Sequence, residues 1–480
     1  MAGDVKRNWI DGEWVEGGNA TPNRNPSNTD EVIGLYAQGG RADAEAAIAA
    51  AEAAFPAWSL SPVQDRHDIL RRIGDGILGR KTALAEMLAR EEGKIMREAA
   101  AEVERAGRIF LFFAGEALRL SGEIVPSVRP GVAVEVTREP VGPVGLITPW
   151  NFPIAIPAWK IAPALCFGNT VVFKPAELVP GTAWILSEII AGSGLPPGVF
   201  NLVMGPGRVV GQAMLDAPAL RAVSFTGSQA TGRRVAAACV EHGRKFQCEM
   251  GGKNPLVVLD DADLEVATDA ALDGAFFSTG QRCTASSRLV VTEGIHARFV
   301  ERLTEKVRAM RVGPALDATS DMGPVVDETQ LEQDLDYIEG ARRDGANLRA
   351  GGGRVDCATP GHFLAPTLFT DTHPSMRINR EEVFGPVATV IRVRDYDEAV
   401  SVANDTAFGL TAGICTTSLR HASHFRRAAR AGMVMVNLPT AGVDYHVPFC
   451  GTKGSSFGPR EQGAYAAEFF TTVKTAYVRA

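Results

Sequence analysis

Several features that mark whole classes of protein are missing from this 480-residue sequence. Its seven cysteines are an odd number and include no CxxC pair. This pattern predicts neither a disulfide framework nor a metal site, and it favours a reducing compartment, the cytoplasm. No long block of Lys and Arg is present, and the formal net charge is −7. Nucleic acid is therefore not an expected partner.

Long apolar runs are scarce as well. Residues 1–18 contain no apolar stretch of the kind found in a secretory signal, so no export is expected. Residues 141–168 are long enough to span a bilayer and carry one charge, Lys160, but they contain five prolines. Proline inside a helix removes a hydrogen bond and clashes with the preceding turn. We therefore expect a buried strand, loop and short helix here, and no membrane partner.

The pattern that is present indicates an α/β fold. From residue 144 onward, short apolar runs such as VGLITPW, NTVVFKP and AVSFTGS are separated by helix-sized segments. Such alternation is typical of a parallel sheet covered on both faces. A second alternating block begins near residue 262. A chain of this length exceeds one core, so we expect two α/β domains joined near Gly251 and Gly252.

The C-terminal stretch AEFFTTVKTAYV, residues 467–478, is rich in β-formers and alternates. No hairpin mate is obvious for it in the sequence. A strand of this kind can pair with the sheet edge of another subunit, so we expect a homo-oligomer.

Three residues could carry chemistry. Cys283, in AFFSTGQRCTASSR, is by residue type more often a core thiol than a nucleophile. Glu249 ends a predicted strand before two glycines, where it is either a general base or an ordinary surface carboxylate. Asn151, in TPWNFP, is either an oxyanion donor or only a turn former. Each alternative stays open for the isolated residue.

Two glycine-rich segments are candidates for phosphate binding. MGPGRVVGQAML, residues 204–215, follows a strand but lacks the standard G-x-G-x-x-G spacing, so we give it little weight. In SFTGSQATGRRV a strand ends at Gly227 and Ser228, and a helix opens before Gly232. Backbone N–H groups and the Ser228 hydroxyl there suit a pyrophosphate, although a simple serine N-cap explains the pattern equally well.

Lys174 and Glu177 follow another predicted strand, at the edge where doubly wound sheets bind nucleotides. A carboxylate there can accept both hydroxyls of an adenosine ribose and repels a 2′-phosphate. If these residues are more than solvated charges, they favour NAD over NADP.

Taken together, seven motifs resemble the aldehyde dehydrogenase superfamily. They are PWNFP, FKPAE, FTGS followed by Gly232, EMGGK, GQRC, EEVFGP (381–386) and PFCGTKGSS (448–456), in the order and at the spacing of that family. The resemblance runs from about residue 8 to the C-terminus. The tail at 442–477 looks like the 2-oxoglutarate semialdehyde (2,5-dioxopentanoate) dehydrogenase branch.

The resemblance implies a subunit of three parts that works as a homo-oligomer, a dimer or tetramer. The parts are a Rossmann-like NAD(P)-binding domain, an α/β catalytic domain and a small β oligomerisation element. Their expected ranges are 1–121 with 143–250, 251–450, and 122–142 with 460–480, respectively.

The resemblance also implies roles for individual residues. Cys283 resembles the nucleophile, Glu249 the general base and Asn151 the oxyanion donor, with the Cys283 backbone N–H as its partner. Glu249 favours hydrolysis to an acid over transfer to coenzyme A. The residues that resemble contacts to the cofactor, NAD with NADP as the alternative, are Trp150, Lys174, Glu177, Gly227, Ser228, Gly232, Glu382 and Phe384.

One departure from the family pattern is Phe449-Cys450-Gly451, where many relatives have Phe-Gly-Gly. Cysteine cannot adopt the positive φ of glycine cheaply, which brings the shape of this loop into question.

Arg282 directly precedes the nucleophile and predicts a substrate that bears a carboxylate. 2-Oxoglutarate semialdehyde is the first choice. The alternatives are succinate semialdehyde or a broad range of aldehydes, with Arg282 then turned away into a structural ion pair. A cofactor-independent thiol esterase and an inactive scaffold are the alternatives from other classes.

Overall fold

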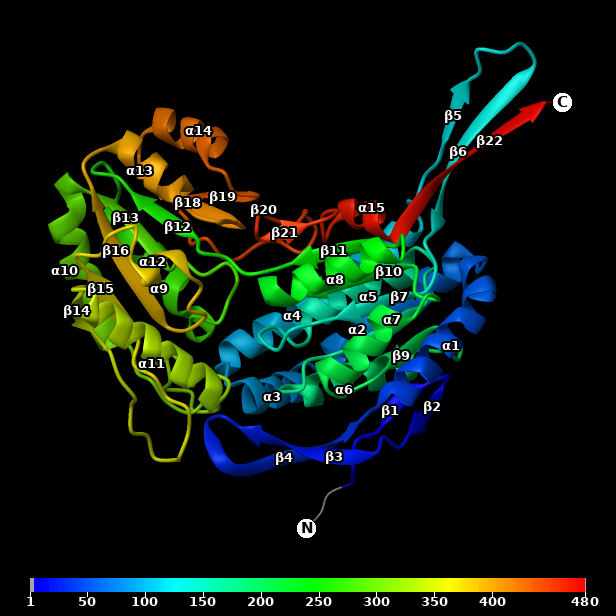
Figure 1. Ribbon diagram of the computed structural model, residues 1–480, viewed down its shortest axis with the longest axis horizontal. Coiled ribbons are helices and arrows are strands. Elements are labelled where there is room, and N and C mark those ends of the chain that lie inside the picture. Colours follow the sequence, from blue (N-terminus) through cyan, green and yellow to red (C-terminus); the bar gives the residue numbers. More distant parts are fainter. Residues whose placement is uncertain (1–3, 480) are drawn as a thin grey trace.

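The computed structural model describes residues 4–479, in two α/β units and a projecting arm (Figure 1). Residues 1–3 and 480, which the expected domain ranges include, lie outside the described residues. Among residues 4–479, no helix combines the length and the apolar character needed to cross a membrane.

The first unit is built on a sheet of eight strands in the order β2-β1-β9-β8-β7-β10-β11-β21. Its five central strands are parallel, and β1, β2 and β21 pair antiparallel at the edges. Strands β7 and β8 are almost wholly buried because helices cover both faces of the sheet. The strands are β1 (Asn8–Ile10), β2 (Glu13–Val15), β7 (Val144–Ile147), β8 (Val171–Lys174), β9 (Phe200–Leu202), β10 (Ala222–Thr226), β11 (Lys245–Glu249) and β21 (Ser456–Phe457).

Eight helices belong to this unit, and a hairpin of two strands flanks it. The helices are α1 (Arg41–Ser59), α2 (Val63–Gly79), α3 (Lys81–Glu92), α4 (Met96–Ala117), α5 (Ala155–Cys166), α6 (Pro180–Ala191), α7 (Gln212–Asp216) and α8 (Gln229–Glu241), and the hairpin is β3 (Asn19–Asn25) with β4 (Asn28–Gln38).

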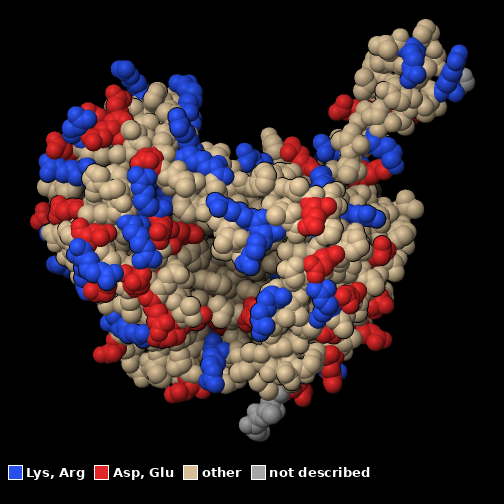
Figure 2. Space-filling model, in the orientation of Figure 1, with Lys and Arg blue, Asp and Glu red and all other residues tan. Residues whose placement is uncertain are grey.

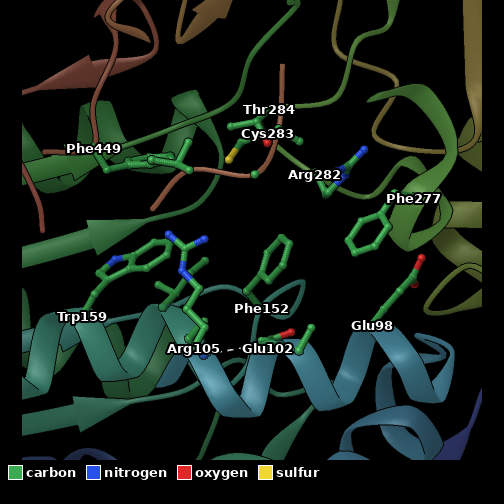
Figure 3. Close-up of a pocket in the computed structure, with 16 residues that line it drawn as sticks. Glu98, Glu102, Arg105, Phe152, Trp159, Phe277, Arg282, Cys283, Thr284 and Phe449 are labelled. Atoms are coloured by element: carbon green, nitrogen blue, oxygen red, sulfur yellow. Dashed lines mark hydrogen bonds between the residues drawn. The ribbon is translucent and has the colours of Figure 1, made fainter. Parts of the chain in front are cut away.

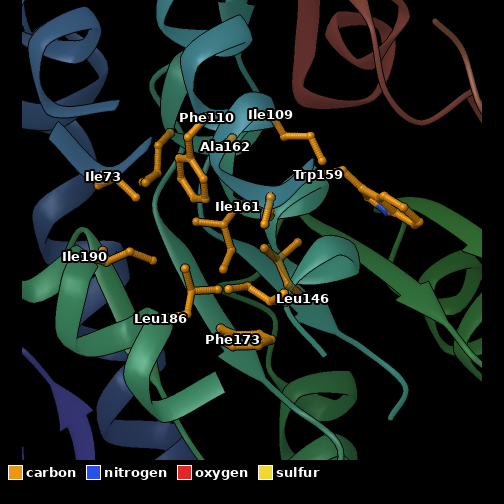
Figure 4. Close-up of a cluster of buried hydrophobic side chains, with 14 of the residues drawn as sticks. Ile73, Ile109, Phe110, Leu146, Trp159, Ile161, Ala162, Phe173, Leu186 and Ile190 are labelled. Atoms are coloured by element: carbon orange, nitrogen blue, oxygen red, sulfur yellow. The ribbon is translucent and has the colours of Figure 1, made fainter. Parts of the chain in front are cut away.

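Segment 141–168 forms strand β7, a turn and the fully buried helix α5, as the prolines predicted. Figure 4 shows Ile161 of α5 packed among Leu146 of β7, Phe173 of β8 and Phe110 of α4. The apolar run therefore lies in the core between the sheet and helices α2 and α4.

The second unit has a sheet of seven strands in the order β14-β15-β16-β13-β12-β18-β19, all parallel except β14. The strands are β12 (Pro255–Val258), β13 (Arg288–Thr292), β14 (Asn347–Ala350), β15 (Thr367–Thr370), β16 (Val387–Val393), β18 (Thr411–Cys415) and β19 (Met433–Val436). The helices are α9 (Leu264–Phe276), α10 (Glu293–Ala309), α11 (Glu328–Arg343), α12 (Arg377–Arg380), α13 (Tyr396–Asn404) and α14 (Leu419–Ala428). The short pair β17 (Phe408–Gly409) and β20 (Thr452–Lys453) lies apart from this sheet.

The projecting arm is a sheet of three strands, β22-β6-β5, formed by Thr471–Arg479, Val132–Pro140 and Glu123–Pro126. The C-terminal strand therefore has a mate in its own chain, β6, which the sequence did not reveal. It also begins later than expected, because Ala467–Phe470 form the helical turn α15. Phe469 and Phe470 are buried there in the core of the first unit, which holds the turn in place.

Candidate active site

The chemistry-bearing residues of the first unit lie at one edge of its sheet. In the parallel register, Ile147 pairs with Lys174 and Thr226 pairs with Glu249, so these four strands end side by side. The carboxyl edge of a doubly wound sheet is where its ligands bind. Asn151, Glu177 and Ser228 follow directly after these strand ends.

Cys283 comes from the second unit, on a loop with unusual backbone conformation. Ser278, Thr279 and Gly280 have φ of 50°, 56° and 66°, in the left-handed region. A Cβ atom on Gly280 would lie 2.3 Å from the Gly385 carbonyl oxygen, so only glycine fits there. The close contact fixes the path of the chain that leads to the half-buried Cys283.

The thiol of Cys283 is protonated at neutral pH in this environment. Burial, together with the charges of Glu382 and Glu249, raises its pKa to about 12, and Arg282 offsets part of that rise. The thiolate is the nucleophilic form, so a reaction at Cys283 requires a base to remove the proton.

Asn151 is held against the cysteine loop through both its side chain and its backbone carbonyl. Its Nδ2 donates to the Gln281 carbonyl oxygen over 2.9 Å, and Lys94 Nζ donates to the Asn151 carbonyl oxygen over 2.8 Å. Lys94 is itself buried and paired with Glu102 over 2.6 Å. The amide therefore has a fixed direction, and its second N–H proton is available to an oxyanion beside Cys283.

Glu249, at the end of β11, is buried, and its Oε2 accepts a hydrogen bond from Ser456 Oγ over 2.5 Å. Burial raises its pKa well above the usual value, and the neighbouring Glu461 raises it further. Glu461 forms a buried ion pair with Lys160 of α5. The charge of Glu249 raises the pKa of the Cys283 thiol, so the two groups are close enough to interact. A carboxylate with a raised pKa in this position suits the role of a general base.

The loop around Cys450 is less constrained than the sequence suggested. Residues with positive φ in the described chain include Lys453 and Gln462 but not Cys450. The Sγ atom donates to the Gly451 carbonyl oxygen over 3.3 Å. The expected conflict between cysteine and a glycine conformation therefore does not arise.

Lys174 and Glu177 meet the glycine-rich segment 204–215. The Gly207 N–H donates to Glu177 Oε1 over 2.7 Å, and a Cβ on Gly207 would lie 3.9 Å from both Glu177 Oε1 and Lys174 Cε. Burial lowers the pKa of Lys174 to about 8, and its Nζ donates to the Pro175 carbonyl oxygen over 2.8 Å. Segment 204–215, to which the sequence analysis gave little weight, thus forms one surface with Lys174 and Glu177.

Ser228 caps helix α8: Thr231 N–H donates to its hydroxyl over 3.4 Å. Ser228 is therefore the N-cap of this helix, one of the two roles that the sequence allowed. A Cβ on Gly227 would lie 2.6 Å from the ring of Phe225, and one on Gly232 would lie 2.5 Å from Met250 Sδ. Both glycines are needed for close packing at the start of α8.

Loops from the two units meet at Trp150 and Phe384. The rings lie edge to face, with centroids 5.4 Å apart, and Phe384 has a φ of 67°. Nearby, Glu382 Oε1 accepts the Gly252 N–H over 2.7 Å, and burial raises the pKa of Glu382 to about 7. The structure thus brings Glu382 and Phe384 to the junction that holds Cys283.

Arg282 is held in part by the backbone of its own unit. Its Nη2 donates to the carbonyl oxygens of Asp273 and Gly274, over 2.7 and 2.8 Å, at the end of α9. The Nη2 group therefore has a structural role, while Arg282 also lines the cavity at Cys283 and its buried Nε has no acceptor among the described residues. The partners are backbone carbonyls and not the ion pair considered as the alternative.

Cys283 opens onto a cavity of about 250 Å³ between the two units. Figure 2 shows the surface hollowed between them, and Figure 3 shows the cavity in close-up. Among its lining residues are five that the sequence analysis did not single out: Glu98, Glu102 and Arg105 of α4, and Phe152 and Trp159 at α5. Arg105 belongs to a helix that carries several acidic and basic residues, which in sequence are typical of a solvated face, so no local signal identifies it.

Residues 14–476 match the model of the aldehyde dehydrogenase family, and the chain belongs to that family of oxidoreductases acting on aldehydes. This confirms the resemblance drawn from the seven motifs and the α/β fold it implied. The chain is 45% identical to an alpha-ketoglutarate semialdehyde dehydrogenase of Haloferax volcanii, over 99% of both chains. It is 41% identical to an alpha-ketoglutaric semialdehyde dehydrogenase of Bacillus subtilis, over 98% of both.

Solved structures show the same fold. A betaine aldehyde dehydrogenase of Staphylococcus aureus in complex with NAD+ superposes with a TM-score of 0.96 at 36% identity. The superposition covers 99% of this chain and 95% of that one.

Proposed function

We propose that this protein oxidises an aldehyde bearing a distal carboxylate to the corresponding acid, with NAD as hydride acceptor and NADP as a weaker alternative. 2-Oxoglutarate semialdehyde is the proposed substrate, and succinate semialdehyde, one carbon shorter, is the second. The observation that carries the proposal is the identity of 45%, over 99% of both chains, to the Haloferax volcanii enzyme of that name. The cavity at Cys283, of about 250 Å³, supports a small substrate, since drug-sized ligands need ~300–1,000 Å³.

Cys283 is the proposed nucleophile. Once a base takes the thiol proton, sulfur forms a bond to the aldehyde carbon, and the π electron pair of the carbonyl moves to oxygen. Asn151 Nδ2 and the Cys283 backbone N–H are the proposed donors to that oxyanion. The fixed direction of the Asn151 amide supports this role, because a donor held in place before the reaction stabilises developing charge most effectively.

Glu249 is the proposed base for hydrolysis of the resulting thioester. It accepts a proton from water as the water oxygen attacks the acyl carbon, and the Cys283 thiolate leaves. The acid is then released, and both residues return to their starting forms. The raised pKa of Glu249 supports this role, since a carboxylate with a higher pKa is a stronger base.

The cofactor residues proposed from the sequence fit a dinucleotide. When bound, NAD supplies the nicotinamide that accepts hydride from the former aldehyde carbon. Lys174 and Glu177 would hold the adenosine ribose, and the missing side chain of Gly207 leaves the surface beside them open. The residues proposed for the phosphates are Trp150, Gly227, Ser228 and Gly232, and those for the nicotinamide ribose are Glu382 and Phe384.

We further propose the domain ranges given above and a homo-oligomer, dimer or tetramer, that works in the cytoplasm. The arm supports oligomerisation, because Ile124, Val128 and Tyr477 on it are 84%, 100% and 62% exposed. Large apolar side chains exposed together mark an interaction surface. Seven unpaired cysteines support a reducing compartment.

A panel of aldehydes tests the proposed function. The purified enzyme is assayed for NADH and NADPH formation with 2-oxoglutarate semialdehyde, succinate semialdehyde, pentanal and benzaldehyde. We expect the two acidic semialdehydes to exceed the neutral aldehydes in kcat/KM by about 10-fold or more. This factor corresponds to the free energy of one hydrogen bond to a charged group, about 1.5–3 kcal/mol. Equal values would make this a general aldehyde dehydrogenase. Ester hydrolysis without any NADH formation would indicate a thiol esterase instead.

A further inference from the structure

We infer that Arg105 of helix α4 binds the distal carboxylate of the substrate and so sets the specificity of this site. The inference rests on the proposed function and deepens it, because it assigns the recognition of the acidic group to a residue that no motif identified.

The first observation is that Arg105 is a cation without an acidic hydrogen-bond or ion-pair partner among residues 4–479. Its Nη2 donates over 3.1 Å to Oε1 of Gln462, a neutral side chain. Its Nε is buried and has no hydrogen-bond acceptor among residues 4–479. In the same part of the chain, no Asp or Glu oxygen lies within 4.0 Å of it. A buried guanidinium with free donors suits a ligand that brings a carboxylate.

The second observation is where the side chain points. Figure 3 shows Arg105 rising from α4 into the cavity, across from Cys283, whereas Arg282 lies beside Phe277 at the other side. Burial lowers the pKa of Arg105, and the charges of Glu102, Asp444 and an ionised Cys283 offset part of that effect. Arg105 and Cys283 line one cavity of about 250 Å³, so we expect a short substrate attached to Cys283 to reach Arg105 with its far end.

The third observation concerns the acids that line the cavity. Glu102, the nearest on α4, is already satisfied: Lys94 donates to Oε2 over 2.6 Å, and the N–H groups of Ile154 and Ala155 donate to Oε1, each over 3.2 Å. Its oxygens are therefore committed to other donors and give Arg105 no hydrogen bond, although its charge still raises the pKa of Arg105.

Glu98 lies farther along α4, beyond Phe277 in the view of Figure 3. Its Oε1 accepts the Ser278 N–H over 3.1 Å. Glu98 and Arg282 thus offset each other's charge at this end of the cavity, whereas Arg105 has no acidic hydrogen-bond partner among residues 4–479. This asymmetry directs a substrate carboxylate to Arg105.

A second unpartnered donor lies beside the guanidinium. Trp159 Nε1 is buried and has no acceptor among the described residues, and the Arg105 guanidinium carbon lies 5.6 Å from the centre of its ring. A carboxylate has two oxygens and accepts several hydrogen bonds, so it can satisfy donors on both side chains. A neutral alkyl chain would leave them unpaired.

Substitution of Arg105 tests the inference. We measure kcat and KM of the wild type, Arg105→Leu and Arg105→Lys with 2-oxoglutarate semialdehyde and with pentanal, a neutral aldehyde of equal chain length. We expect the acidic-to-neutral ratio of kcat/KM to fall about 10- to 100-fold in Arg105→Leu, mainly through KM. Arg105→Lys should recover part of the ratio, because it keeps the charge but loses the planar fork.

Binding without turnover gives a second readout. Glutarate, an unreactive dicarboxylate, should inhibit the wild type competitively, and its Ki should rise by a similar factor in Arg105→Leu. The matched control is Arg108→Leu on the exposed side of α4, which should leave the ratio and the Ki unchanged. If Arg105→Leu unfolds, Arg105→Gln, which keeps a polar side chain, takes its place.

The outcomes separate the two proposals. A wild type that does not prefer the acidic aldehyde would overturn the proposed substrate. A wild type that prefers it, together with an Arg105→Leu variant that keeps the preference and the Ki for glutarate, would overturn the role of Arg105 alone.

Discussion

The two ends of the proposed site are held very differently. At the acyl end, Cys283 follows a left-handed loop that glycine contacts fix, and Asn151 is bonded on both sides. At the adenosine end, Glu177 is exposed, and its one side-chain hydrogen bond is to the Gly207 N–H. The proposed reacting groups are thus positioned by buried structure, whereas the proposed ribose contact is an exposed side chain that can be changed without disturbing the core. Substitutions should then be severe at one end and graded at the other.

Cys283→Ala should have the largest effect. Removal of the nucleophile leaves no group to form the thioester, so dehydrogenase activity should fall by about 10⁴-fold or more. Folding and NAD binding should persist, since no cofactor contact is removed, and thermal unfolding with titration of NAD measures both. Cys357→Ala, a half-buried cysteine outside the cavity, is the control and should remain active. Substantial NADH formation by Cys283→Ala would show that Cys283 is not the nucleophile.

Glu249→Gln should be the next most severe change. Acylation still occurs once, but the thioester is not hydrolysed, so rapid mixing should give a burst of about one NADH per active site and little turnover afterwards. Glu241→Gln on the exposed side of α8 is the matched control.

The pH profile sharpens the same test. Burial and Glu461 raise the pKa of Glu249 above its ordinary 4.5, so protonation removes the base as the pH falls. In the wild type, kcat should therefore decline on the acid side at a pH above the ordinary glutamate range. Glu249→Gln should lack that decline. A variant with unchanged turnover and an unchanged profile would contradict the role.

Glu177→Ser should have the smallest effect. Loss of the carboxylate removes an acceptor for the ribose hydroxyls and the repulsion of a 2′-phosphate, so the NAD-to-NADP ratio of kcat/KM should shift towards NADP. We expect about a 3- to 10-fold shift, because exposed charges contribute ~0.2–1 kcal/mol and a hydrogen bond adds a similar amount. Steady-state kinetics with both cofactors measure the ratio, and Glu188→Ser is the control. No shift would place recognition of the ribose elsewhere.

The sequence was informative where function depends on local motifs. The strand ends that carry Asn151, Lys174 and Glu249 follow from alternation and turn residues, which are short-range signals. The family motifs then added roles that residue type alone left open.

The sequence was uninformative where function depends on the direction of a side chain. Arg282 is adjacent to Cys283 in the chain, yet its Nη2 is bonded to the end of α9, while Arg105, 178 positions before Cys283, points into the cavity. Gly207 was undervalued because its partner, Glu177, comes from another strand end. Contacts of this kind arise only when distant segments pack together.

The left-handed residues before Cys283 have a consequence for protein engineering. Ser278 and Thr279 each occupy a conformation that costs a residue with a side chain about 1–3 kcal/mol, and the rest of the fold must supply that free energy. A search for thermostable variants would therefore select glycine at these positions. Such variants would relax the loop and let the thiol sample more orientations, so stability would be gained at the expense of turnover. Residues 278 and 279 should be held constant when this enzyme is stabilised.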